Sequence, residues 1–162
     1  EQEGTYPLPE AQLDRFMFAI DLKYPSIDEE IAIVKATTSD HKPEIEALFN
    51  AEEIVAVQHL IRRIPVPDNV VNYAVQLVNS TRPNLDTATE YVKQYLDWGA
   101  GPRASQNLIL GAKAHAAING KFSPDIEDVK AIALGILRHR IIKNYKAEAE
   151  GISEDEIISK LL

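Results

Sequence analysis

Only one stretch of this sequence alternates as a β-strand requires, and it stands near the start of the chain. Apolar side chains occupy every second position from Phe16 to Leu22, and this period of two predicts a strand over residues 16–23 that ends before Pro25. A lone strand is not stable in water because its backbone groups need a sheet partner. We find no second convincing strand. This one therefore either pairs weakly within the chain or belongs to a sheet whose other strands lie elsewhere.

From Ser26 onward the hydrophobic pattern is helical, and Ile31 and Val34 are expected to face a core. Residues 85–98 fit either a helix or an extended segment. Pro, Gly and capping residues predict helices near residues 28–39, 50–64, 68–80, 102–118, 124–140 and 154–162. The chain is thus predicted to be mainly α, with a strand-bearing segment at its N-terminus.

Composition excludes several classes of protein. The chain has 162 residues and a net charge of −8, which disfavours nucleic acid and anionic membranes as partners. No stretch reaches the roughly 18 apolar residues of a membrane span. The absence of Cys excludes thiolate metal sites and fits a reducing compartment such as the cytoplasm. The four His have no partner at metal-ligand spacing, so we expect no metal site.

Met17 is the only methionine of the chain. The sequence therefore does not begin at a natural start, and we expect it to be a piece of a longer protein.

Two arginines are candidates for contact with an anion. Arg103 is the second residue of the helix that Pro102 opens, where a cation opposes the helix dipole at a cost of about 0.3–1 kcal/mol. The same helix end offers free N–H groups, so Arg103 and the helix terminus together would suit a phosphate. The alternative is that Arg103 pairs with a carboxylate from elsewhere in the chain.

Arg15 lies just before the predicted strand. An arginine at the exposed end of a strand can be offered to a nucleotide that a neighbouring subunit binds. The alternative is a surface ion pair with Asp14 or Glu10, which would contribute little to stability.

Three motifs, in order along the chain, resemble MoxR-type AAA+ ATPases. Residues 1–16 resemble the segment that follows the sensor-1 strand, and residues 98–104 (WGAGPRA) resemble the sensor-2 motif. Residues 137–141 and 147–152 are similar to the characteristic C-terminal stretch. One departure is visible, because the family more often has Ser where Gly101 stands.

The resemblance implies a division of the chain. Residues 1–25 would be the end of the αβα nucleotide-binding core, with its arginine-finger segment and last strand. Residues 26–162 would be the helical lid, a helix bundle that carries the sensor-2 motif. A hinge would lie near residues 24–26.

The resemblance also implies roles for particular residues. Arg15 matches the arginine finger, which acts in trans on a neighbour's nucleotide. Arg103 matches the sensor-2 arginine, with Pro102 and Gly101 beside it at the nucleotide. Whether Arg103 acts on the nucleotide of its own subunit or of a neighbour stays open.

For the full-length protein, the resemblance implies an ATPase that uses ATP and Mg²⁺ for chaperone-like remodelling or maturation of client proteins. It implies a ring of identical subunits, taken to be a hexamer, and a partner with a von Willebrand factor A domain. The Walker A and Walker B motifs are not in this sequence. We therefore expect no ATPase activity from these residues alone, and no tightly bound nucleotide.

Two other functions are compatible with parts of the sequence. A non-enzymatic helical module could bind other proteins through its acidic surface. A helix-turn-helix reader of DNA is disfavoured by the charge of −8.

Overall fold

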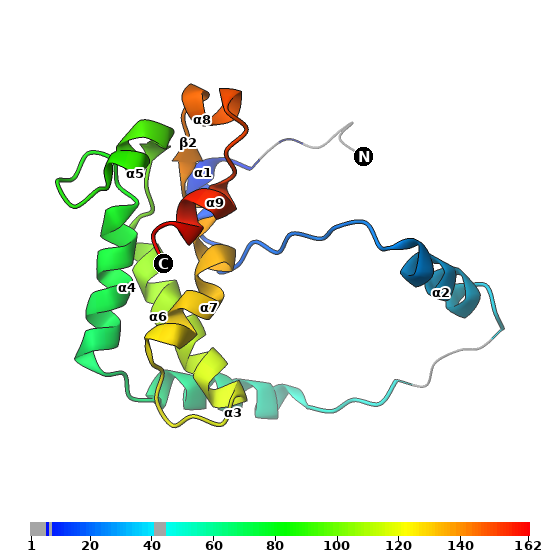
Figure 1. Ribbon diagram of the computed structural model, residues 1–162. Helices are drawn as coiled ribbons and strands as arrows, with labels where there is room; N and C mark the ends of the chain where they lie inside the picture. Colours follow the sequence, from blue (N-terminus) through cyan, green and yellow to red (C-terminus); the bar gives the residue numbers. More distant parts are fainter. Residues whose placement is uncertain (1–5, 7, 41–44) are drawn as a thin grey trace.

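The computed structural model describes residues 6, 8–40 and 45–162, and it is mainly helical (Figure 1). Its elements in chain order are α1 (Glu10–Leu13), α2 (Ile27–Thr37), α3 (Ala51–Arg63), α4 (Asp68–Ser80), α5 (Glu90–Tyr95), β1 (Leu96–Trp98), α6 (Pro102–Ile118), α7 (Ile126–Leu137), β2 (Ile142–Lys143), α8 (Tyr145–Ala149) and α9 (Glu154–Ser159). Capping residues set several helix starts: the side chains of Ser26, Asn50 and Asp125 each accept a hydrogen bond from the backbone N–H three residues on.

The core lies where α6 packs against α4 on one side and α7 on the other. One face of α6 is lined with small residues, and Ala104 and Ala112 are fully buried together with Leu108. Such small side chains let the neighbouring helices approach α6 closely. Ile136 of α7 and Val78 of α4 fill the space on either side. α6 is therefore the central helix of the bundle.

A short antiparallel sheet joins the end of α5 to the segment after α7. Leu96 pairs with Lys143, and Trp98 pairs with Ile142. The ambiguous stretch 85–98 thus contains both a helix and a strand. Our expectation of no second strand was wrong, because strands of two and three residues are too short to show a period of two.

The strand predicted over residues 16–23 is not formed, although the mainly α prediction is confirmed. The segment leaves α1 and makes one backbone hydrogen bond to a helix end, from Ala19 N to Gly135 O at 2.8 Å. No strand lies beside it in the described part of the chain. Ile20 and Leu22 are exposed as a result.

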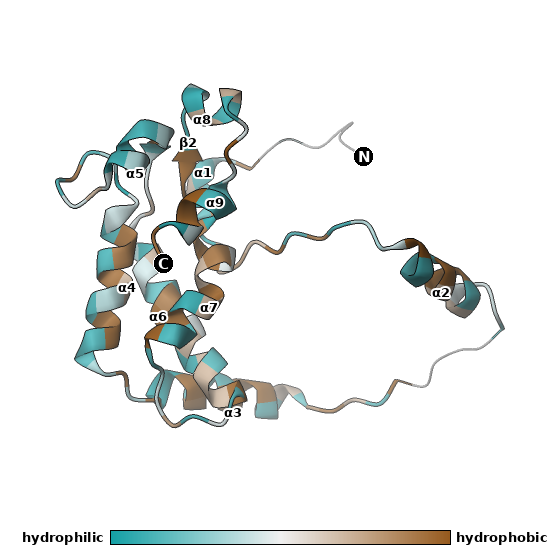
Figure 2. Cartoon of the chain, viewed as in Figure 1, coloured by the Kyte–Doolittle hydropathy of each residue, from teal (hydrophilic) through white to brown (hydrophobic). Residues whose placement is uncertain are grey.

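Helix α2 lies apart from the other helices (Figure 1). Ile31 and Val34 are exposed, so the prediction that they face a core was wrong for the described residues. Figure 2 shows that the ribbon of α2 includes both hydrophobic and hydrophilic residues. The predicted domain boundary between residues 25 and 26 stays a prediction. No helix in the described ranges is both long and apolar enough to cross a membrane.

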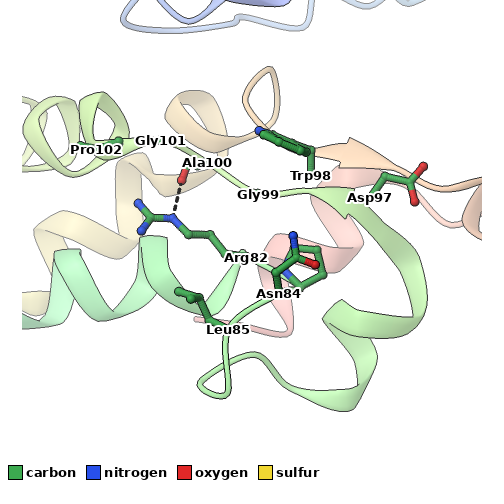
Figure 3. Close-up of a pocket in the computed structure, with 10 residues that line it drawn as sticks. Arg82, Asn84, Leu85, Asp97, Trp98, Gly99, Ala100, Gly101 and Pro102 are labelled. Carbon is green, nitrogen blue, oxygen red and sulfur yellow. Dashed lines mark hydrogen bonds between the residues drawn. The ribbon is translucent and has the colours of Figure 1, made fainter.

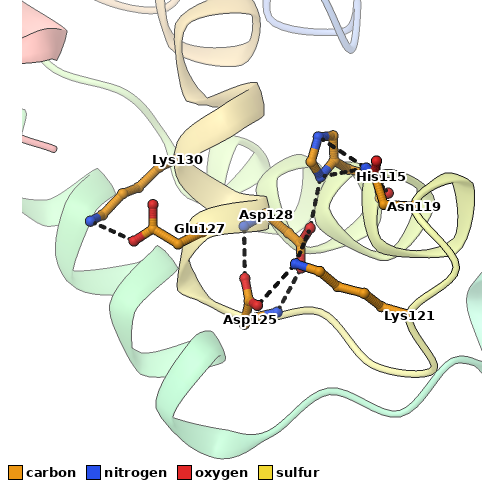
Figure 4. Close-up of polar contacts among 7 residues, drawn as sticks. All are labelled: His115, Asn119, Lys121, Asp125, Glu127, Asp128 and Lys130. Carbon is orange, nitrogen blue, oxygen red and sulfur yellow. Dashed lines mark hydrogen bonds and ion pairs between the residues drawn. The ribbon is translucent and has the colours of Figure 1, made fainter.

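A buried carboxylate fixes the corner between α6 and α7 (Figure 4). Asp128 has no exposed surface, and it accepts hydrogen bonds from Asp125 N at 2.8 Å and Lys121 Nζ at 3.1 Å. His115 Nδ1 lies 2.7 Å from its other oxygen. Two of these partners, His115 and Lys121, come from outside the first turn of α7, so the local sequence pattern does not reveal them.

These contacts make the stability of the fold depend on pH. Burial by itself would raise the pKa of Asp128, but the bonds from Asp125, His115 and Lys121 outweigh it and lower the pKa from 3.8 to about 2. A carboxyl whose pKa is lowered in the folded state stabilises that state above its unfolded pKa. This contribution, about 2 kcal/mol, is lost as the pH falls from about 4 to about 2.

We expect Asp128→Asn to remove this component. The free energy of unfolding, measured by urea titration at a series of pH values, should fall less steeply below about pH 4 in the variant than in the parent chain. Glu127→Gln is the matched control, because Glu127 is in the same helical turn but forms only an exposed pair with Lys130. Equal pH dependence in the parent and Asp128→Asn would contradict the assignment.

Candidate functional site

The turn before α6 is held by residues that directly follow α4 (Figure 3). Thr81 Oγ1 accepts a hydrogen bond from Ala100 N at 2.9 Å, and Arg82 Nε donates to Ala100 O at 2.9 Å. Both backbone groups of Ala100 are thus satisfied, and Thr81 and Ala100 are fully buried. Pro102 follows as the first residue of α6, as predicted. The backbone of Arg103 is therefore fixed, although its side chain is exposed.

Arg103 forms an ion pair with Asp14, in the segment just after α1. The second oxygen of the same carboxylate accepts a hydrogen bond from Arg140 Nε at 3.0 Å. Arg103 thus pairs with a carboxylate from elsewhere in the chain, which was one of the two expectations for it. Because Asp14 immediately precedes Arg15, the contact brings the two candidate arginines to the same region of the molecule.

Arg140 is the buried anchor of this arrangement. Its side chain is 1% exposed, and it donates to the backbone oxygens of Asp14, Phe16, Met17 and Ile136 as well as to the Asp14 carboxylate. Burial lowers the pKa of Arg140 and the adjacent Asp14 acts against that shift, so the guanidinium is charged at neutral pH.

Sequence reasoning missed the role of Arg140. It follows the end of α7, where a cation is usually explained by the helix dipole. Arg140 pairs with Asp14, which lies 126 positions away in the chain. Nothing in the spacing of the two residues reveals this pairing.

His139 adds a second contact to the same segment. Its Nε2 lies 3.0 Å from Phe16 O, and since a carbonyl oxygen only accepts, Nε2 carries the proton. Nδ1 is buried without a hydrogen-bond partner in the described structure. Burial lowers the pKa of His139, so the ring is held in its neutral form. Together, His139 and Arg140 fasten residues 14–17 to the end of α7.

Arg15 and Arg103 line the same hollow, together with Arg62 from the last turn of α3. We call this the arginine hollow. It is open to solvent and has a volume of about 770 Å³, a size typical of small-molecule sites. Its other lining residues are Val71, Val75, Ser105, Gln106, Asn107, Ile109 and Leu110. Neither alternative ion pair predicted for Arg15, with Asp14 or Glu10, is present among the described residues. Arginines around a shared hollow are suited to a phosphate or another polyanion.

Gly101 and Pro102 lie beside this hollow rather than in its lining. They line a separate pocket of about 270 Å³ between the α6 turn and the loop after α4 (Figure 3). Trp98 and Leu85 contribute to that pocket. The described residues contain no group of three or more acidic or His side chains that could hold a metal ion.

Comparison with known proteins identifies the family. Residues 88–161 match the AAA lid domain. The whole chain is 34% identical to Chaperone MoxR1 of Mycobacterium tuberculosis, of which it covers 43%, and 31% identical to the uncharacterised protein YeaC of Bacillus subtilis, of which it covers 48%. A crystal structure of a candidate ATPase from Cytophaga hutchinsonii superposes with a TM-score of 0.90 at 37% identity, over 99% of this chain and 49% of that one.

The chain belongs to the MoxR-type AAA+ ATPases. The predicted family is thereby confirmed, and the lid match lies within the residues predicted to form the lid. The chain spans about half the length of the relatives that it matches. The finger and sensor-2 assignments of Arg15 and Arg103 stay predictions.

The two glycines of the sensor-2-like turn have different surroundings. A Cβ at Gly99 would lie 2.3 Å from Thr81 O and 2.7 Å from Arg82 Cα, whereas a Cβ at Gly101 would meet nothing within 4 Å. Backbone atoms cannot move aside as a flexible side chain can. Gly99 is therefore required by close approach, and the open space at Gly101 accommodates the Ser that is more frequent in MoxR-type chains.

We expect Gly99→Ala to destabilise the MoxR-type fold by about 1–3 kcal/mol, since the α6 turn must move away from α4. Gly101→Ala is the matched control and should change stability by no more than about 0.5 kcal/mol. Thermal unfolding of both variants measures the difference. A Gly99→Ala variant as stable as Gly101→Ala would show that the contact with Thr81 does not constrain the turn.

Proposed function

We propose that this chain supplies the arginine finger, Arg15, and the sensor-2 arginine, Arg103, of an ATPase that remodels or matures client proteins. The observation that carries the proposal is the convergence of both arginines on the arginine hollow. The similarity to a protein named Chaperone MoxR1 supports the chaperone-like activity.

The chemistry of ATP hydrolysis fits two arginines at one site. Phosphoryl transfer to water spreads negative charge over the γ-phosphate oxygens, and an enzyme accelerates it mainly by positioning and electrostatic stabilisation. Arg15 is exposed and can reach a phosphate. Arg103 would exchange its contact with Asp14 for a contact with phosphate, while Arg140 continues to hold the Asp14 carboxylate.

The shared hollow also bears on which nucleotide Arg103 contacts. An arginine finger acts on the nucleotide of an adjacent subunit. Because Arg103 lines the same hollow as Arg15, the proposal places Arg103 in trans as well. One face of each subunit would then present both arginines to its neighbour's ATP.

The remaining parts of the proposal concern the full-length protein. In the proposal, Mg²⁺ and the phosphates of ATP are bound by the Walker A and Walker B motifs of the full-length protein, which are not in this sequence. Action in trans requires a ring of subunits, and the cytoplasm is the proposed location. Client proteins and a partner with a von Willebrand factor A domain are part of the proposal through the family alone.

We expect Arg15→Ala and Arg103→Ala, made separately in the full-length protein, each to lower the kcat of ATP hydrolysis by about 100-fold or more. Arg63→Ala is the control, because Arg63 is exposed on α3 and does not line the hollow. Steady-state ATPase assays measure the effect, and thermal unfolding verifies that each variant is folded.

Mixed rings test the action in trans. Subunits with Arg15→Ala or Arg103→Ala retain their own nucleotide site, so mixing them with subunits that cannot bind ATP should restore hydrolysis at the mixed interfaces. Unchanged kcat in both variants would remove the two arginines from the site. If mixing restores activity to Arg15→Ala but not to Arg103→Ala, Arg103 acts on the nucleotide of its own subunit.

A further inference from the structure

We infer that Arg62 is a third phosphate-binding residue of the arginine hollow, an inference that rests on the proposed function of Arg15 and Arg103. Sequence reasoning did not single out Arg62, because a basic residue in the last turn of a helix is expected to complement the helix dipole. The structure brings its side chain to the same hollow as the other two arginines.

The position of Arg62 is fixed by its backbone rather than by burial. Helix α3 has no buried residue, yet its C-terminal end is tied to the bundle at two points. Lys113 Nζ of α6 donates to Arg62 O at 2.9 Å, and Ser123 Oγ donates to Pro65 O at 3.2 Å. The last turn of α3 is thereby held against α6, with Arg62 beside the hollow and Arg63 outside it.

The hollow carries more positive than negative charge, which favours the binding of an anion. Within the described ranges, the guanidinium groups of Arg15 and Arg62 pair with no carboxylate. Asp14 is the partner of Arg103, but it is shared with Arg140. Three cations beside one shared carboxylate, on a chain whose net charge is −8, are explained by an anion of high charge that arrives from another molecule.

The lining indicates which part of a nucleotide would enter. Apolar side chains of Val71, Val75, Ile109 and Leu110 lie among the arginines. None of the ten lining residues is aromatic, so the hollow offers no ring on which a base would stack. It therefore suits the terminal phosphates of a neighbour's ATP, with the base held elsewhere.

The experiment compares Arg62→Ala with Arg63→Ala in the full-length protein, with Arg62→Lys as the conservative variant. We expect Arg62→Ala to lower kcat/KM for ATP by about 10- to 100-fold, the size of one lost charged hydrogen bond. Arg63→Ala should stay within about twofold of the parent. Arg62→Lys should recover part of the loss, because it keeps the charge but not the bidentate fork.

A double variant separates phosphate contact from a purely structural role. If Arg62 and Arg15 contact the same phosphates, the loss in Arg15→Ala/Arg62→Ala should be smaller than the product of the two single losses. Thermal unfolding of Arg62→Ala should match that of Arg63→Ala. The inference would be overturned if Arg62→Ala is destabilised and if the kcat/KM loss of the double variant equals the product of the two single losses.

The failure of this inference can be distinguished from the failure of the proposed function. If Arg15→Ala and Arg103→Ala are impaired while Arg62→Ala behaves like Arg63→Ala, the hollow binds phosphate through two arginines only. If Arg15→Ala and Arg103→Ala retain full activity, the proposed function itself fails, and Arg62 loses its assigned ligand with it.

Discussion

The arrangement of the site depends on one buried guanidinium. Burying a charged group without partners is very costly, and the cost is offset only when its hydrogen bonds are satisfied. Arg140 uses all its donors on residues 14–17, the Asp14 carboxylate and Ile136 O. The segment that contains Arg15 is therefore fastened to the end of α7, although Asp14 and Arg140 are 126 positions apart in the chain.

A second constraint acts on the opposite side of the same site. The buried Thr81 hydroxyl and the Arg82 side chain hold both backbone groups of Ala100, and this fixes where α6 begins. Asp14 then connects the two constraints, since one of its oxygens contacts Arg103 of α6 and the other contacts Arg140. The relative position of Arg15 and Arg103 is thus set by contacts within the chain, one of which uses the Arg103 guanidinium itself.

Local signals allowed much of this fold to be predicted from the sequence. The helix that Pro102 opens ends at Ile118 as expected, and Asn50 forms the capping box that its spacing suggested. The predicted strand failed because a strand depends on a neighbouring chain segment that periodicity does not report. The prediction that Ile31 and Val34 face a core was wrong for the same reason, because an amphipathic pattern does not reveal whether a partner is present.

The candidate site was only half predictable for a related reason. Arg15 and Arg103 could be singled out from their motifs, whereas Arg62 and Arg140 resemble ordinary cations at the ends of helices. Their roles arise from the tertiary structure, which carries Arg140 into a buried pocket and Arg62 to the rim of the hollow.

These contacts change how movement of the lid would affect catalysis. A boundary between residues 25 and 26 would assign Arg15 to the nucleotide-binding core and Arg103 to the lid. However, residues 14–17 are bound to His139 and Arg140 at the end of α7, so Arg15, the proposed finger, is held to the helical bundle. A rotation of the bundle would carry both arginines together toward or away from the neighbour's nucleotide. In the proposed function, coupling hydrolysis to such a rotation would then need no separate hinge between Arg15 and Arg103.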